Sequence, residues 1–316
     1  MPALLAAALG GSEVSAQTIL PDPLDETEDK VGSQAGLDAW ITDFRPRALA
    51  AGVAAATFDA AMRGVVFDAK VVERDRNQNE FSKTIWDYLD TAVSGDRVAL
   101  GLQAIERNRA LLERIEAEYG VEKEVVAAVW GLESAYGTYR GDLPVLGSLA
   151  TLAYEGRRGA FFEAELIAAL KIVQGGHVGQ LAGSWAGASG HTQFMPSSWE
   201  RFAVDFDGDG KKNLWGEDPA DALASTANYL RFWGWTKGQP WGVEVSLPDG
   251  FDYDQTTERV VKPVGDWQAM GVRTVSGADL PDHGSGSILL PGGYRGAAFL
   301  IWPNFQVIEK YNTADA

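Results

Sequence analysis

The chain has 316 residues, 46 % hydrophobic and 22 % charged, an ordinary globular composition that is long enough for two packed units. Its net charge of −17 argues against nucleic acid as a partner, because phosphate binding needs a basic surface. There is no cysteine, which excludes disulfides, thiolate zinc sites and a lipid-bearing N-terminal cysteine, and 3 scattered histidines do not favour a histidine metal centre.

Residues 1–18 are apolar and rich in alanine, and they contain a V-S-A-Q sequence typical of the end of an export signal. We interpret them as the remnant of a signal peptide, with a disordered tail as the alternative. Residues 19–35 are rich in proline and acidic side chains and are predicted to form a linker. No later stretch is apolar enough to span a bilayer, so we expect a soluble mature protein.

Residues 36–120 are predicted to form a helical N-terminal part. Apolar residues recur at helical spacing over about 36–64, and a long amphipathic helix is expected over 96–119. Gly120 follows it as a suitable C-cap. Another helix is expected up to Glu133, because Val125, Val129 and Leu132 form one apolar stripe.

Glu133 stands near the end of this apolar helix, beside Trp130 and Tyr136 and just before Gly137. Partial desolvation raises the pKa of a carboxyl group. A glutamic acid that stays protonated near neutral pH can act as a general acid. The alternative is a solvated residue that closes an amphipathic helix.

The segment after Glu133 contains turn signals and a short apolar run that ends at Arg157 and Arg158. The two arginines are interpreted as solvated surface or as ligands of an anionic substrate group. A helix follows, and then residues 175–199, where glycines alternate with polar residues, predict a loop that approaches another group closely. Ser184 and Gln193 are candidates for hydrogen bonds to a sugar, and a merely flexible loop is the alternative.

An acidic segment begins at Asp205, with Asp207 and Asp209 at alternate positions and Gly210 directly after them. This is the first half of an EF-hand calcium loop, in which Lys211 would offer its backbone carbonyl. The twelfth position, normally glutamate, is Gly216, so Glu217, Asp218 or Asp221 would have to close the site. We predict a structural calcium ion, with an acidic turn that binds nothing as the alternative.

A helix is expected over about 219–234, and then the pattern changes. Short runs such as G-V-E-V-S-L and S-I-L-L-P, bounded by glycine, proline and aspartate, predict a small β-rich lobe over 239–302. Residues 303–316 begin a helical pattern that stops soon after Y-N, so this version of the chain is interpreted as truncated.

Several linked motifs resemble the lytic murein transglycosylases of the membrane-bound lytic transglycosylase B type. They include V-W-G-L-E-S-x-Y-G, L-A-T-L-A-Y-x-x-R-R, G-S-W-A-G-A-x-G-x-x-Q-F-M-P-S-S-W, D-F-D-G-D-G-x-x-N-L-W and P-N-F-x-V-I-x-x-Y-N, in one order over roughly residues 36–312. The resemblance implies a mainly α fold: a lysozyme-like helical core over 121–238, an EF-hand-like calcium loop at 205–221 and the small β-rich lobe.

The resemblance implies Glu133 as the single catalytic acid/base. Positions that line the sugar groove in the family correspond to Tyr88, Arg157, Arg158, Ser184, Gln193, Phe194, Tyr229, Tyr311 and Asn312. Positions that bind calcium correspond to Asp205, Asp207, Asp209, Lys211 and Asp221. The family continues past the Y-N pair with further helix, which this sequence lacks, so one wall of the groove is expected to be incomplete. Some members also carry a lipid-modified cysteine, and its absence here indicates a soluble periplasmic form.

The resemblance implies cleavage of peptidoglycan glycan strands between N-acetylmuramic acid and N-acetylglucosamine, with formation of 1,6-anhydromuramic acid ends. Most glycosidases use two carboxylates, whereas only Glu133 stands in a suitable motif, and this fits assistance by the substrate's own acetamido group. The alternatives are a lysozyme-type hydrolase, a catalytically inactive peptidoglycan-binding protein and a calcium-binding structural protein.

Overall fold

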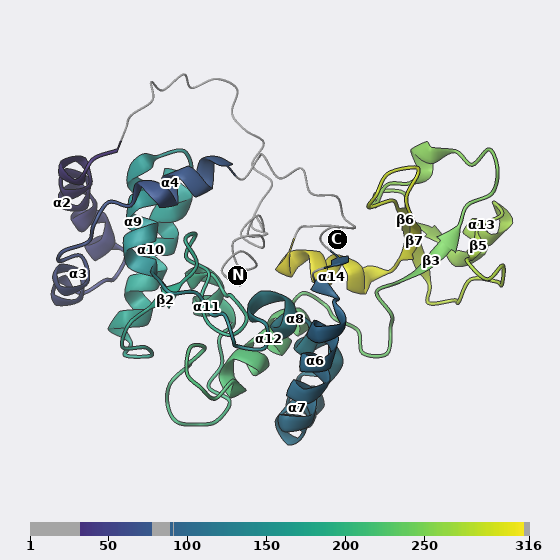
Figure 1. The fold of residues 1–316 in the computed structure, drawn as a ribbon, viewed down its shortest axis with the longest axis horizontal. Coiled ribbons are helices and arrows are strands. Elements are labelled where there is room, and N and C mark those ends of the chain that lie inside the picture. Colours follow the sequence, from purple (N-terminus) through teal and green to yellow (C-terminus); the bar gives the residue numbers. More distant parts are fainter. Residues whose placement is uncertain (1–31, 78–88, 91, 313–316) are drawn as a thin grey trace.

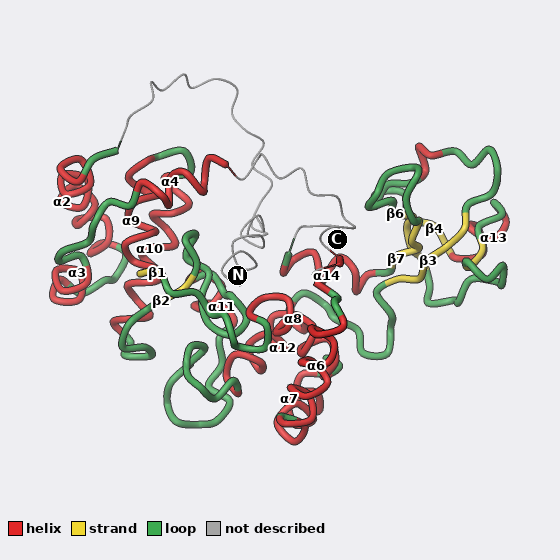
Figure 2. Tube along the Cα trace, viewed as in Figure 1, coloured by secondary structure: helices red, strands yellow, loops and turns green. Residues whose placement is uncertain are grey.

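The computed structural model describes residues 32–77, 89–90 and 92–312. The expected export segment, most of the linker and Tyr88 lie outside the described residues. The described chain is mainly helical, and a small sheet lobe lies at one end of it (Figures 1 and 2). The mainly α class and the small sheet lobe are therefore confirmed. Within the described residues, no helix combines the length and apolar character needed to cross a membrane.

One group of helices lies at the end of the molecule away from the sheet lobe (Figure 1). It consists of α2 (Gln34–Ala50), α3 (Ala55–Ala61), α4 (Ala69–Arg76), α9 (Val145–Glu155) and α10 (Gly159–Gln174). Phe44, Leu149 and Phe162 are among the fully buried side chains that these helices share. Helix α9 was missed in the sequence, because seven of its eleven residues are buried and no single apolar stripe marks it.

The second group surrounds Glu133. It consists of α6 (Gly95–Arg107), α7 (Arg109–Tyr119), α8 (Lys123–Ser134), α11 (Pro196–Phe202) and α12 (Ala220–Phe232). The single helix expected over 96–119 was wrong, because the chain breaks at Asn108, whose side chain donates to the Ala104 carbonyl at 2.9 Å. Gly120 ends α7 in the left-handed conformation (φ 68°), as predicted.

The sheet lobe contains five short antiparallel strands in the order β4-β6-β7-β3-β5. They are β3 (Gly242–Ser246), β4 (Lys262–Pro263), β5 (Arg273–Thr274), β6 (Ser285–Leu289) and β7 (Ala298–Ile301), with the 3-10 turn η3 (Tyr253–Gln255) and helix α13 (Val264–Ala269) beside them. Leu300 pairs with Val243 on one side and Ile288 on the other, and Trp267 and Trp302 are fully buried beneath. Helix α14 (Pro303–Tyr311) then returns from this lobe to the helical body, beside α8 (Figure 1). Tyr311, at the end of α14, lies close enough to Glu133 for the two groups to interact electrostatically.

Candidate active site

Glu133 occupies the last turn of α8, directly before a tight left-handed turn. Ala135 and Tyr136 have φ values of 50° and 58°, and Gly137 follows at 83°. Such values are costly for residues with a side chain, at roughly 1–3 kcal/mol each, and persist only where surrounding contacts impose them. Here the Gly137 amide donates to Ser134 Oγ at 2.9 Å, and the Tyr136 amide donates to the Trp130 carbonyl at 3.2 Å. The turn therefore sets where the Glu133 side chain leaves the helix.

The carboxyl group of Glu133 has no hydrogen-bond partner among the described residues, although the residue is only partly exposed. Burial raises its pKa from 4.5 to about 8, and no neighbouring charge contributes to the shift. Glu165 is also buried and its pKa is also raised by burial, but its carboxylate accepts from the amide and hydroxyl of Ser197 at 2.9 and 2.6 Å. Of these two carboxyls, only Glu133 is free to exchange a proton with a substrate.

Three of the predicted groove residues form an aromatic cluster close to Glu133. The rings of Phe194, Tyr229 and Tyr311 lie with centroids 5.0–6.0 Å apart. The pKa of Tyr311 is raised well above its usual value, first by burial and then by the nearby Glu133 carboxylate. Its hydroxyl donates to the Thr192 carbonyl at 2.7 Å, so the ring is held in place. The 190s loop, α12 and α14 thus bring these three rings together.

Gln193 and Ser184 differ in how their polar atoms are used. Gln193 adopts a left-handed conformation (φ 51°), and its amide nitrogen donates to the carbonyls of Arg140 and Gly190 at 3.0 and 2.9 Å. Only its carbonyl oxygen is left to accept from a ligand.

The Ser184 hydroxyl is buried, and no described residue forms a hydrogen bond with it, which makes it a candidate ligand group. Asn312 follows directly after α14, and its amide donates to the Ile308 carbonyl at 3.1 Å.

Arg157 and Arg158 are not the free surface residues that one interpretation allowed. Both form ion pairs with Asp75 at the end of α4, whose side chain is 1 % exposed. Arg157 Nε donates to Asp75 Oδ2 at 2.7 Å, and Arg158 binds the other carboxylate oxygen. Asp75 was not predicted from the sequence, because it stands 82 residues before Arg157. The two guanidinium groups are therefore tied to α4 and retain only part of their surface for a ligand.

The acidic loop has the expected arrangement at its beginning. Single carboxylate oxygens of Asp205, Asp207 and Asp209 lie within 4.8 Å of one another, all three residues being exposed. Asp205 also accepts from the amides of Gly208 and Gly210 at 2.8 and 2.9 Å. Three convergent carboxylates repel one another without a cation, and hard oxygen ligands suit calcium, so this donor set fits the ion.

Asp221 and Lys211 are arranged differently from these three aspartates. Asp221 is buried, and its two oxygens accept from the amides of Phe206 and Asn213, both at 2.7 Å, one on each side of the loop. Asp221 therefore joins the two ends of the loop by hydrogen bonds and does not belong to the cluster of Asp205, Asp207 and Asp209. Lys211 is exposed, and its amide donates to Asp209 Oδ1 at 2.8 Å.

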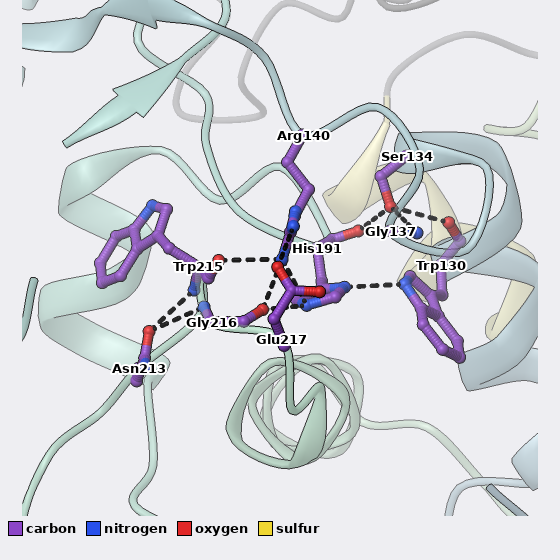
Figure 3. A network of polar contacts seen from close by, with 9 residues as sticks. All are labelled: Trp130, Ser134, Gly137, Arg140, His191, Asn213, Trp215, Gly216 and Glu217. Carbon is purple, nitrogen blue, oxygen red and sulfur yellow. Dashed lines mark hydrogen bonds and ion pairs between the residues drawn. The ribbon is translucent and has the colours of Figure 1, made fainter. Parts of the chain in front are cut away.

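A polar network that the sequence did not reveal links the Glu133 turn to the end of the acidic loop. His191 is its centre, and Arg140, Trp130, Ser134 and Glu217 take part (Figure 3). From the sequence, the histidines were considered only as metal ligands. His191 lies inside the motif of residues 183–199, and this position was the available signal.

The raised pKa of Glu133 predicts a stability effect that needs no substrate. The neutral carboxyl stabilises the fold fully below pH 4.5, and this contribution is lost as the pH rises to about 8. Glu133→Gln keeps a neutral group at every pH, so it should become more stable than the wild type as the pH rises through this window, by up to roughly 1.4 kcal/mol per pH unit. Urea unfolding at pH 4 and pH 9 measures the effect. Equal stability of both proteins at pH 9 would contradict the burial of the carboxyl.

Comparison with known proteins shows the family. The model of the family described as "Transglycosylase SLT domain" matches residues 36–316. The membrane-bound lytic murein transglycosylase B of Escherichia coli (strain K12) is 34 % identical over 236 residues, which are 71 % of this chain and 62 % of that protein. The chain thus spans less than two thirds of the length of this curated relative.

Solved structures agree with this match. SltB3 from Pseudomonas aeruginosa, in complex with NAG-anhNAM-pentapeptide, is 51 % identical and has a TM-score of 0.84, over 88 % of this chain and 75 % of that one. The Escherichia coli lytic transglycosylase Slt35 in complex with calcium is 28 % identical with a TM-score of 0.74, over 90 % and 89 % of the two chains. The resemblance drawn from the motifs is confirmed, and the chain belongs to the family of SLT-domain transglycosylases of the membrane-bound lytic transglycosylase B type.

Proposed function

We propose that the chain is a peptidoglycan lytic transglycosylase, a glycosidic bond lyase that cleaves between N-acetylmuramic acid and N-acetylglucosamine and leaves 1,6-anhydromuramic acid ends. The observation that carries the proposal is the unpaired carboxyl of Glu133, whose pKa burial alone raises to about 8. The family match and the ligand of SltB3, NAG-anhNAM-pentapeptide, support the substrate class. Among the described residues, no second carboxylate contributes to the pKa shift of Glu133, which favours chemistry with a single acid/base over the usual pair.

In the proposed reaction, protonated Glu133 donates its proton to the glycosidic oxygen, and the bond from that oxygen to the anomeric carbon breaks. The acetamido oxygen of the muramyl residue attacks its own anomeric carbon. The Glu133 carboxylate then removes the proton from the C6 hydroxyl, whose oxygen displaces the acetamido oxygen and closes the anhydro ring. Glu133 ends protonated, and no water is consumed.

The other predicted residues would bind and orient the glycan. Ser184 and Asn312 would hold the acetamido group, and the buried hydroxyl of Ser184 has no hydrogen-bond partner among the described residues. Gln193, Phe194 and Tyr229 would position the sugar rings. The remaining proposed groove residues are Tyr88, Tyr311, Arg157 and Arg158.

Calcium binding and a periplasmic location complete the proposal. Asp205, Asp207, Asp209 and the Lys211 carbonyl would hold the ion in an EF-hand-like loop, and Asp221 would brace the loop through its backbone contacts. Bound calcium would neutralise the clustered carboxylates and rigidify the loop. The export-signal pattern of residues 1–18 supports a periplasmic location, where peptidoglycan strands are available.

Calcium removal should be visible in thermal stability. A ligand that binds only the folded state stabilises it by about 2.7 kcal/mol at 100 times its Kd. We therefore expect calcium to raise the melting temperature of the chelator-treated wild type, and the double variant Asp205→Asn/Asp207→Asn to show no such rise. Magnesium is the control, since it fits this loop poorly. An identical rise in the double variant would contradict the assignment of the site.

The proposed function is tested by digestion of purified peptidoglycan in water enriched in oxygen-18. A lytic transglycosylase releases fragments that carry no label at the new end, because no water enters the product. A lysozyme-type hydrolase incorporates one labelled oxygen per cleavage, and this result would overturn the proposal. Sedimentation of the protein with intact peptidoglycan, without any released fragment, would instead identify an inactive binding protein.

A further inference from the structure

We propose that His191 is a positioning residue for Glu133, which joins the turn after α8 to the segment that leaves the acidic loop. This role deepens the proposed function and rests on it for the kinetic tests only. The side chain of His191 is 3 % exposed, so its ring contacts protein on every side. Its location between Trp130 and Gly216 is visible in Figure 3.

The first half of the link runs from His191 to α8. Trp130 Nε1 donates to His191 Nδ1 at 3.2 Å, and the Ser134 hydroxyl donates to the His191 carbonyl. These two donors lie on either side of Glu133 in the helix. His191 therefore holds both the residue one turn before the catalytic carboxyl and the residue directly after it.

The second half runs from His191 to residues 214–216. Because Nδ1 accepts from Trp130, the ring proton is on Nε2, which donates to the Gly216 carbonyl at 2.7 Å. The His191 amide donates to the Leu214 carbonyl at 2.9 Å. This segment is itself held by Arg140, which donates to the carbonyl of Trp215 at 3.0 Å and also to that of Gly216. The ring thus bridges two separate parts of the chain.

The strained turn explains why such a bridge is needed. Ala135 and Tyr136 hold left-handed conformations that relax unless neighbouring contacts impose them. The His191 ring packs directly on Gly137, where an added Cβ would lie 2.5 Å from Nδ1. The imidazole therefore blocks movement of this turn toward it. Loss of the ring would free the turn and open the Glu133 carboxyl, now only partly exposed, to more water.

The decisive experiment compares His191→Leu with His191→Asn. The leucine keeps bulk without a hydrogen-bond acceptor, whereas the asparagine keeps an acceptor for Trp130 near the position of Nδ1. We expect His191→Leu to lower kcat by roughly 10- to 100-fold with less than about twofold change in KM, because small misplacement of a catalytic group costs rate and not binding. His191→Asn should recover most of kcat. His283→Ala, in the sheet lobe, is the control for loss of a histidine.

A second readout separates positioning from simple stability and does not need activity. Carbon-13 NMR of the Glu133 carboxyl should show its pKa falling toward 4.5 in His191→Leu, as water reaches the group, and remaining near the wild-type value in His191→Asn. Thermal melts verify that each variant is folded. An unchanged kcat and an unchanged carboxyl pKa in folded His191→Leu would overturn the inference. An inactive wild type would overturn the proposed function instead, and the titration would still decide the role of His191.

Discussion

Glu133→Gln should retain binding to glycan strands and lose at least ~100-fold in turnover, since general acid catalysis contributes about 10²–10⁴. Glutamine has nearly the same shape as the buried neutral carboxyl but has no acidic proton to donate. Product release from peptidoglycan measures turnover, and co-sedimentation measures binding. The effect should appear in kcat at all pH values.

A matched control for this variant lies on the same helix. Glu124→Gln makes the same chemical change at a side chain that is 62 % exposed and forms an ion pair with Lys123. It should leave turnover unchanged. Substantial residual activity in Glu133→Gln, or an equal loss in Glu124→Gln, would remove Glu133 from the catalytic role.

Arg157→Ala/Arg158→Ala should lower the free energy of unfolding by roughly 3–5 kcal/mol, because it leaves the Asp75 carboxylate buried without either of the guanidinium groups that pair with it. The effect follows from the position of Asp75, whose side chain is 1 % exposed and which accepts from both guanidinium groups. Urea unfolding measures it. The prediction concerns stability and is independent of any contact that the arginines make with a glycan.

The control variant replaces Asp75 as well as the two arginines, so that no carboxylate is left buried. The triple variant Asp75→Asn/Arg157→Ala/Arg158→Ala should recover much of the unfolding free energy that the double variant loses. An uncharged amide costs less to bury than a carboxylate. Each arginine replaced singly should have a smaller effect, because the other still pairs with Asp75. A loss below about 1 kcal/mol in the double variant would mean that the arginines do not neutralise Asp75.

Local patterns in the sequence predicted the parts of the site that depend on neighbouring residues. The helix that carries Glu133 was predicted, but its buried face was not: Val126, Trp130 and Ser134 are buried, whereas Leu132 of the predicted stripe is 38 % exposed. The alternate aspartates at 205, 207 and 209 lie in one loop, as predicted. The raised pKa of Glu133 was also predicted, because the sequence places this carboxyl beside Trp130 and Tyr136 in an apolar helix. The sheet lobe was predicted for the same reason, from short runs bounded by glycine, proline and aspartate, whereas the helical core was implied by the resemblance to the family.

The parts that were missed depend on contacts between distant residues. Asp75 and Arg157 stand 82 positions apart, and His191 stands 61 positions after Trp130, so spacing alone does not pair them. Helix α9 was missed because it is buried on most sides. Asp221 was predicted as a calcium ligand, and only the structure showed that its oxygens accept backbone amides across the loop.

The central claim is that burial keeps the Glu133 carboxyl protonated near neutral pH, and titration of this group tests the claim most directly. Carbon-13 NMR of protein labelled at glutamate carboxyls, with Glu133→Gln to assign the resonance, follows the group from pH 3 to pH 10. The structure predicts a midpoint of about 8. A midpoint near 4.5, the ordinary value for glutamate, would show that Glu133 is ionised at neutral pH and would contradict its role as the proton donor.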